Sequence, residues 1–416
     1  MYDWAYGAFS TVVVTFVFPA YFVRAVAPDA VRGTSWWAAA QAAAGLAIAL
    51  SAAPLGALAD AGGRRRALLG LFTALMIGLT GALWFVRPRA GDAVLALALA
   101  GCGTLAFETA LVFYNAMLPQ ITAPGRLGRL SGIAWACGYG GGLLCLALSL
   151  FLLVRPDPPL FGLSRADAGN VRATALLAAG WMALFAWPML AFAPPQPAPA
   201  PWRVALRRGA DGLAASLRDA ARAPTLRRFL LARMLYADGL TALFAFGGLY
   251  AAGTFGMDAE AVLALGIALN VTAGIGAALF ALVEDRIGAK AVILTALAAL
   301  MAFGAGALIV RSATLFCACA LGLGLFVGPA QSASRSLMAR LAPPEARNAQ
   351  FGLYALSGRV TGFVGPACIA LATALAGGQR VGMAVILVLL GAGALLLVPL
   401  RATATSASAP PPALAR

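Results

Sequence analysis

Long uncharged runs of apolar residues constrain this chain more than any other feature of its sequence. Many of them reach about 18 residues or more, which exceeds what a soluble core helix needs and matches a hydrocarbon layer of about 30 Å. Only 11% of the 416 residues are charged, whereas a soluble domain carries about 25%. A soluble chain of this composition would expose large apolar patches. The sequence therefore predicts an all-α integral membrane protein.

Twelve of these runs are predicted to cross the membrane as helices. Their approximate ranges are 4–26, 36–59, 66–86, 93–117, 129–153, 171–192, 229–252, 260–283, 289–310, 313–339, 349–374 and 379–399. If both termini lie inside, the inner connecting segments hold roughly twice as many Arg and Lys residues as the outer ones, as basic loops normally do. We therefore expect a multi-pass protein of the cell inner membrane with both termini cytoplasmic.

The longest polar stretch divides the twelve runs into six and six. It begins with a proline-rich segment and continues as a basic stretch with interleaved leucines, a pattern typical of either a simple tether or a helix lying on the membrane surface. The predicted organisation is an N-terminal six-helix bundle at 1–192, a cytoplasmic linker at 193–228, a C-terminal six-helix bundle at 229–400 and a disordered tail at 401–416.

The composition also argues against several classes of function. Histidine is absent and none of the six cysteines forms a C-x-x-C pair, so the usual proton shuttle and the commonest metal ligand are missing. We expect no metal site, no cofactor and no catalytic centre, and hence not an enzyme. The net charge of +15 comes from residues between the apolar runs, where it faces anionic lipid rather than nucleic acid.

Two loops in corresponding positions repeat one pattern of acid, glycine and base. A carboxylate at such a helix end can pair with a basic group or cap a neighbouring helix N-terminus. We predict that these loops form a gating latch, the alternative being that their bases only fix the topology. The residues involved are Gly56, Asp60, Gly63 and Arg64 after the second run, and Asp285 and Arg286 after the eighth.

The first of these loops closely resembles the best-known loop signature of the major facilitator superfamily. Members of that superfamily consist of two pseudo-repeated six-helix bundles with a substrate site between them near the bilayer midplane. The resemblance implies that spans one, four, seven and ten line a central cavity.

Four charged residues lie deep within the apolar runs, where an unpaired charge is costly, whereas Arg233 is shallow. Glu108, Asp238 and Arg335 fall on three of the cavity-lining spans, and Arg359 lies near the middle of span eleven. We interpret the acids as proton carriers and the arginines as groups that bind a substrate anion or balance the acids; a structural ion pair is the alternative. Further polar residues that are candidates for substrate or proton contacts are Asn115, Tyr236 and Asn270. Asp3 is interpreted only as a cap of the first helix.

Several stretches resemble one branch of the superfamily, the bacterial relatives of the fungal autophagy-associated vacuolar amino-acid effluxer. They include Tyr2-Asp3-Trp4-Ala5, Phe113 to Pro119, Tyr236 to Gly239, Ile267 to Asn270 and Gly328 to Gln331. The chain departs from that family at Tyr6 and Gly7, where the family usually has Asn-Ser.

The resemblance implies efflux of amino acids or similar small polar solutes. From these observations we expect a monomeric, proton-coupled secondary transporter that works by alternating access, with a small-molecule substrate, protons and the lipid bilayer as its partners. One alternative is proton-coupled export of drugs or other hydrophobic compounds. An alternative from another class is a non-transporting membrane scaffold or sensor.

Overall fold

The computed structural model describes residues 1–400 except 195, 197, 363 and 377. The predicted disordered tail at 401–416 therefore lies outside the described residues. Within the described part of the chain, helices are joined by turns and short loops, and no strand occurs. Short 3₁₀ turns occur in the loops at Ala90–Asp92, Leu118–Gln120, Pro124–Arg126, Leu160–Gly162 and Pro344–Ala346.

The first half of the molecule contains the helices of predicted spans one to six. Span one consists of four consecutive helical segments. They are α1 (Tyr2–Ala8), a π-helical segment at Phe9–Phe16, α2 (Val17–Tyr21) and a second π-helical segment at Phe22–Val26. The others are α3 (Ala30–Gly62), α4 (Arg65–Ala82) with a 3₁₀ turn at Leu83–Phe85, α5 (Ala93–Met117), α6 (Leu127–Leu148) with a π-helical end at Ser149–Val154, and α7 (Gly169–Ala191).

The second half contains the helices of predicted spans seven to twelve. They are α9 (Pro224–Phe255), α10 (Ala259–Ile287), α11 (Ala289–Ile309), α12 (Ala313–Leu341), α13 (Arg347–Ser357), α14 (Val364–Ala376) and α15 (Gln379–Leu397). Local sequence explains several of the starts. Asp258 accepts a hydrogen bond from the Ala261 backbone N–H and so caps α10, and Pro224 stands in the first turn of α9, where its missing N–H costs nothing.

Span eleven is the one place where a predicted span is interrupted. Eleven helices in the described part of the chain are long and apolar enough to cross a membrane. The prediction of one continuous helix over 349–374 is wrong, because helical bonding stops at Ser357, passes through turns and resumes at Val364. Gly358 and Gly362 lie in the intervening segment, and glycine weakens a helix interior. The two shorter helices α13 and α14 together form span eleven and, with the eleven long helices, make up the twelve predicted spans.

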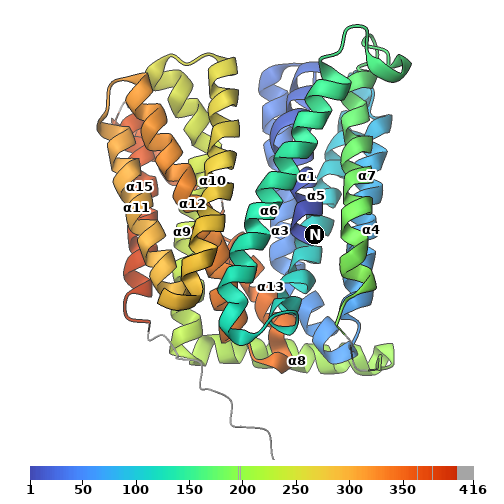
Figure 1. Ribbon diagram of the computed structural model, residues 1–416, viewed down its shortest axis with the longest axis vertical. Helices are drawn as coiled ribbons and strands as arrows, with labels where there is room; N and C mark the ends of the chain where they lie inside the picture. The colour runs from blue at the N-terminus through green and yellow to red at the C-terminus, as the bar shows by residue number, and fades with distance from the viewer. Residues whose placement is uncertain (195, 197, 363, 377, 401–416) are drawn as a thin grey trace, which may run out of the picture.

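The basic part of the linker forms a helix, α8 (Trp202–Arg222), which lies across one end of the bundle (Figure 1). Ala205 and Ser216 are buried, whereas Leu206 and Leu217 are exposed, so one side of α8 packs on the protein. Gly209 permits that contact, since a Cβ there would lie 3.2 Å from the Leu58 Cα. We call this end of the bundle the linker end. The helix continues the predicted basic stretch only to Arg222, because α9 already begins at Pro224.

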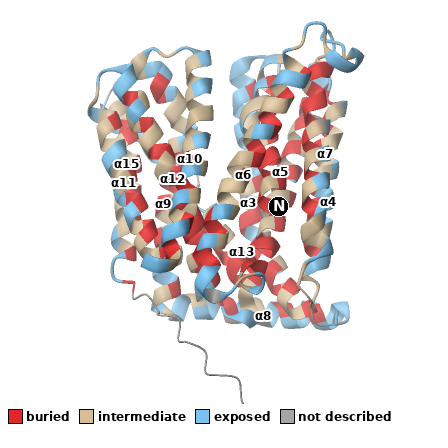
Figure 2. Cartoon of the chain, viewed as in Figure 1, coloured by how far each residue is buried: buried red, intermediate tan, exposed pale blue. Residues whose placement is uncertain are grey.

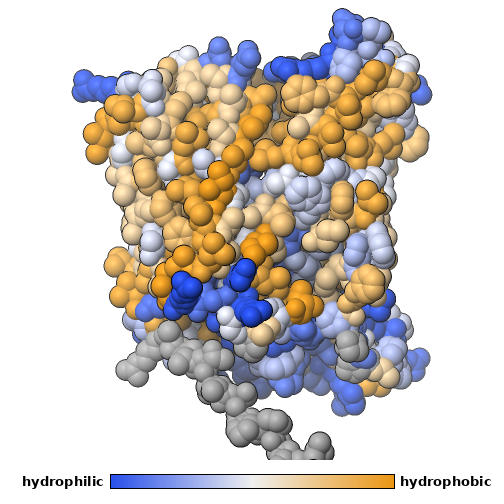
Figure 3. All heavy atoms as spheres, in the orientation of Figure 1, coloured by the Kyte–Doolittle hydropathy of each residue, from blue (hydrophilic) through white to orange (hydrophobic). Residues whose placement is uncertain are grey.

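The two halves stand side by side, with α6 and α10 adjacent where they meet (Figure 1). Buried residues are concentrated where the halves approach each other towards the linker end (Figure 2). Small residues allow this approach: a Cβ on Gly132 would lie 2.5 Å from the Ala281 Cβ, and one on Gly352 would lie 2.4 Å from the Ala53 Cα. On the face in view, apolar residues cover much of the middle of the molecule, and hydrophilic residues gather at both ends (Figure 3). The domain boundaries given above stay a prediction.

Candidate gate and coupling site

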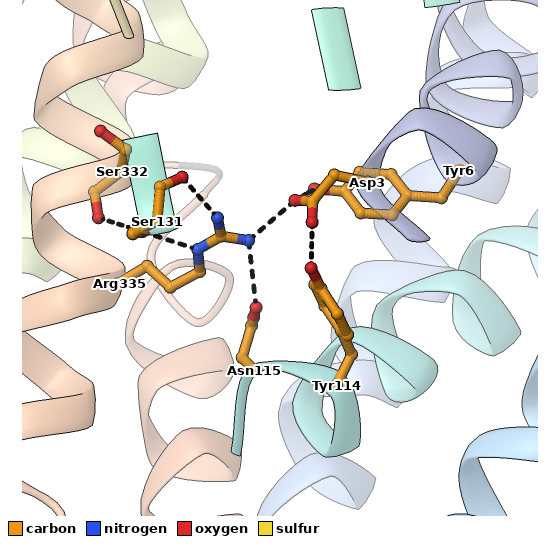
Figure 4. A network of polar contacts seen from close by, with 7 residues as sticks. All are labelled: Asp3, Tyr6, Tyr114, Asn115, Ser131, Ser332 and Arg335. Carbon is orange, nitrogen blue, oxygen red and sulfur yellow. Dashed lines mark hydrogen bonds and ion pairs between the residues drawn. The ribbon is translucent and has the colours of Figure 1, made fainter. Parts of the chain in front are cut away.

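Arg335 on α12 is the centre of a buried polar network that joins the two halves (Figure 4). Its Nε donates to the Ser131 hydroxyl at 2.9 Å and its Nη2 donates to the Ser131 carbonyl at 2.7 Å. Its Nη1 donates to the Asp3 carboxylate at 2.9 Å and lies 3.4 Å from the Asn115 side-chain oxygen. Because all three acceptors belong to the first half, this arginine ties α12 to α1, α5 and α6.

Asp3 receives more donors than its ion pair alone supplies. The Tyr6 hydroxyl donates to Oδ1 at 2.8 Å, and the Tyr114 hydroxyl donates to Oδ2. Only 1% of Asp3 and 2% of Arg335 is exposed. Burying two charges is favourable only when further hydrogen bonds satisfy both of them, and here the hydroxyls satisfy the acid while Ser131 satisfies the base.

This network changes the interpretation of two residues. Asp3 does not cap its helix, since the first helix has no side-chain cap, and it pairs instead with a residue 332 positions away. The sequence predicts that Arg335 balances the charge of Glu108 or Asp238, or binds a substrate anion. Among the described residues its ion-pair partner is instead Asp3. One contact of the network could be predicted from the sequence: Asp3 and Tyr6 lie three residues apart, on one face of a helix.

Glu108 and Arg359, two of the predicted charges, are brought together. Arg359 lies in the turn between α13 and α14, and its Nη2 donates to Oε1 of Glu108 on α5. This ion pair also crosses from one half to the other. In contrast to the sealed Arg335 network, 38% of the Arg359 side chain and 18% of the Glu108 side chain are exposed. The Glu108–Arg359 pair is therefore partly exposed.

Three of the remaining candidates, Asp238, Tyr236 and Asn270, lie apart from these pairs. Asp238 has no arginine partner among the described residues; it accepts a hydrogen bond from the Gly365 backbone N–H at 2.8 Å. Tyr236 bonds to the Ser334 hydroxyl at 2.7 Å. Asn270 donates to the Gly266 carbonyl of its own helix at 2.9 Å. Asn115 alone of the polar candidates joins a charged network, that of Arg335.

A mostly apolar cavity of about 400 Å³ lies in the second half, and Asn270 is on its wall. Helices α9, α10, α11, α12 and α15 supply most of its lining, and Thr15 and Phe16 contribute from the first half. None of the four predicted charges lines this cavity.

The predicted latch residue Asp60 caps the first turn of α13 in the opposite half. Its carboxylate accepts from the backbone N–H groups of Asn348 at 3.3 Å and Ala349 at 2.9 Å, and from the Asn348 side chain. The base that pairs with it is Arg65, at 3.4 Å, rather than Arg64. Arg64 instead stacks 4.3 Å above the Trp202 ring of α8.

Asp285 makes the equivalent contact in the other direction. Its carboxylate accepts from the backbone N–H groups of Gly128 at 2.8 Å and Arg129 at 3.0 Å, at the start of α6, and pairs with Arg340 at 3.1 Å. Arg286 is exposed. A carboxylate at a helix N-terminus satisfies free N–H groups and complements the helix dipole. The two acids therefore join the halves at the linker end by the same physical device.

Comparison with known proteins now places the chain. A profile of the family described as "Vacuole effluxer Atg22 like" matches residues 30–408. The chain belongs to this family.

Its relatives are consistent with that assignment. The uncharacterized MFS-type transporter YxiO of Bacillus subtilis is 24% identical over 400 residues, which cover 95% of this chain and 92% of the relative. Autophagy-related protein 22 of Cryptococcus neoformans is 28% identical over 187 residues, which cover 40% of this chain and 32% of that protein. The E. coli fucose:proton symporter FucP has the same fold, with a TM-score of 0.73, 16% identity and 97% coverage of both chains.

The predicted superfamily, branch and fold class are thereby confirmed. This member of the Atg22-like family is a multi-pass membrane transporter with the major facilitator fold.

The contact between α3 and α13 in this transporter yields a first prediction. A Cβ on Gly56 would lie 2.3 Å from the Asn348 backbone oxygen, and backbone cannot move aside cheaply. We expect Gly56→Ala to separate the halves at the linker end and to raise the labelling rate of a cysteine placed at Ala349. Gly45→Ala is the matched control on the same helix, because nothing lies within 4 Å of its new Cβ. Equal labelling of the two variants would show that this contact does not hold the halves together.

Proposed function

We propose that this transporter exports amino acids or similar small polar solutes across the cell inner membrane by alternating access, with protons as the coupling ion. The observation that carries the proposal is the ion pair of Glu108 and Arg359, which joins the two halves and is partly exposed. A carboxylate can take up a proton, and a guanidinium can bind a carboxylate through two parallel hydrogen bonds. Both functions meet here in one contact.

The pair links proton binding to substrate binding through competition. While Glu108 is ionised, it occupies Arg359. A solute that carries an ammonium and a carboxylate group can insert into the pair, with its ammonium on Glu108 and its carboxylate on Arg359. A proton on Glu108 removes the charge that holds the ammonium and releases the solute. Proton and solute therefore bind in alternation, so that an inward proton gradient drives export. Asn115, Tyr236 and Asn270 are proposed as polar contacts around this exchange.

The linker end supplies the gate in this proposal. Asp60 and Asp285 cap helices of the opposite half, and Arg335 binds Asp3 across the same interface. All of these contacts have to separate for the site to open at this end, and they re-form when the site faces the other side. We place this end in the cytoplasm, because the basic residues of α8 and of the Arg64 to Arg66 loop gather there.

Two comparisons support the direction and the coupling ion. The matching family is described as effluxer-like, and the structural neighbour FucP is a proton symporter. A monomer suffices for the mechanism, since both halves of the site come from one chain.

Export of hydrophobic compounds is the second candidate, and the apolar cavity beside Asn270 favours it. The two candidates differ in the role of charge. A carboxylate-bearing solute requires the Glu108–Arg359 pair, whereas an apolar compound held in the cavity does not.

Flux into proteoliposomes distinguishes the candidates. The purified protein is assayed with a panel of radiolabelled amino acids, organic acids and neutral lipophilic dyes, each with and without an imposed pH gradient. We expect amino acids or organic acids to be moved and the gradient to increase their accumulation. Movement of the dyes alone would replace the proposed substrate class.

A further inference from the structure

The interruption of span eleven is braced on both sides by charged side chains of one neighbouring helix, α9. On the side of α13, Arg233 Nη1 donates to the Tyr354 carbonyl at 2.6 Å and to the Ser357 hydroxyl at 3.0 Å. Its guanidinium also stacks on the Tyr354 ring, 3.5 Å from the ring centroid. A cation thus sits at the C-terminal end of α13, where free carbonyls and the helix dipole favour positive charge.

On the other side, Asp238 occupies the start of α14. Its Oδ2 accepts from the Gly365 backbone N–H at 2.8 Å. The residue is 3% exposed, and Oδ1 has no hydrogen-bond partner among the described residues. An anion at a helix N-terminus is the favourable complement of a cation at a C-terminus, so α9 supplies the right charge at each end of the interruption.

Two glycines make this double contact possible. A Cβ on Gly358 would lie 2.5 Å from Arg233 Nη1, and a Cβ on Gly365 would lie 3.3 Å from the Asp238 carboxyl carbon. The fit of Arg233 to Gly358 and of Asp238 to Gly365 shows that the turn and the α9 side chains match each other. The turn between them carries Arg359, the residue that reaches Glu108 in the opposite half.

We infer that Arg233 and Asp238 are positioning residues, which hold the interrupted helix in the shape that presents Arg359 to Glu108. Neither touches the Glu108–Arg359 pair; both act through the backbone of the turn. A Lys in place of Arg233 keeps the charge but loses the planar guanidinium that stacks on the Tyr354 ring.

Asp238 is a second carboxyl group, besides Glu108, at which a proton can bind and act on the turn. This part of the inference rests on the proposed proton coupling. A proton on Asp238 removes the negative charge at the N-terminus of α14 and weakens its hold on the turn. Among the described residues, the charged and titratable groups around this stretch are Arg233 and Tyr236 on α9, Tyr354 on α13, Arg359 in the turn and Glu108 on α5. Helix α12 contributes the Ser334 hydroxyl, and α15 places Leu389 and Leu390 beside Gly239. Proton binding at Asp238 therefore changes the position of Arg359.

A cross-linking assay tests the brace without any transport substrate. Cysteines replace Glu108 and Arg359 in a background that lacks the six native cysteines, and a short bis-methanethiosulfonate joins them. Because this exchange removes the ion pair itself, the cross-linking rate reports how well the turn is held by α9. We expect Asp238→Ala and Arg233→Met to slow cross-linking by about fivefold each, the effect of losing one helix cap. Asp211→Ala, on the exposed part of α8, is the control and should leave the rate unchanged.

Three outcomes separate the parts of the inference. Because the thiolate is the reacting species, every rate rises with pH, and the informative quantity is the ratio of the parent rate to the Asp238→Asn rate at each pH. Slower cross-linking in both Asp238→Ala and Arg233→Met, with a ratio that changes with pH, supports the brace and its proton dependence. Slower cross-linking with a ratio that stays constant supports the brace and overturns the proton part. A rate in Asp238→Ala and Arg233→Met equal to that of the parent would overturn the positioning role, whatever the protein transports.

Discussion

Replacing Arg335 by methionine is expected to abolish transport and to destabilise the protein by about 3–5 kcal/mol, the usual result of leaving one buried charge without its partner. Asp3 would keep its two tyrosine donors, but its negative charge would have no counterion in a site that is almost fully shielded from solvent. Thermal unfolding of the purified protein in detergent measures the loss of stability.

A double variant separates the ion pair from the packing around it. Asp3→Asn combined with Arg335→Met removes both charges, and it should unfold at a higher temperature than Arg335→Met alone. Arg222→Met is the matched control, because Arg222 is exposed on α8 and its loss should change the melting temperature little. If the double variant is as unstable as the sum of its two single variants, the pair contributes no coupling energy and Arg335 acts through other contacts.

Replacing Glu108 by glutamine is expected to leave substrate exchange intact and to abolish accumulation driven by a pH gradient. The amide keeps an oxygen that accepts a hydrogen bond from Arg359, yet it cannot take up a proton. The competition between proton and solute at this carboxyl group is then lost, while the two halves can still rock. The measurement compares substrate exchange with gradient-driven uptake in the same proteoliposomes.

The control for this variant is Glu260→Gln, at the start of α10 in the second half. It carries the same chemical change away from the proposed site, and it should behave like the parent protein. Gradient-driven uptake that persists in Glu108→Gln would place the proton on another carboxyl group, and Asp3 and Asp238 would be the first to examine.

The spans and the internal repeat could be predicted because their signals are local. A long uncharged apolar run forms a helix in a bilayer, because the helix satisfies its own backbone hydrogen bonds. The acid, glycine and base of the loop after span two recur, within a few residues of each other, in the loop after span eight. The suggestion that Asp60 caps a neighbouring helix also follows from local chemistry, since a carboxylate at a helix end seeks free N–H groups. What the sequence could not provide was which helix it caps.

The partners of the charges could not be predicted because they are far apart in the chain. Asp3 and Arg335 are separated by 332 residues, and Glu108 and Arg359 by 251. Asp3, Glu108 and Asp238 all lie on spans that the fold brings together, so the sequence offers several partners for Arg335. The interruption of span eleven was missed for another reason: glycine is common in membrane helices and does not by itself break them, and the charged side chains that stabilise the interruption come from α9.

Proton coupling is tested by measuring proton movement during substrate flux. The protein is reconstituted into proteoliposomes that contain a pH-sensitive dye, with no pH gradient, and the amino acid or organic acid identified by the flux panel is added on one side. The account predicts that downhill movement of the solute changes the internal pH, and that the change disappears in Glu108→Gln although solute still exchanges. Solute movement by the parent protein with no change in internal pH would contradict proton coupling.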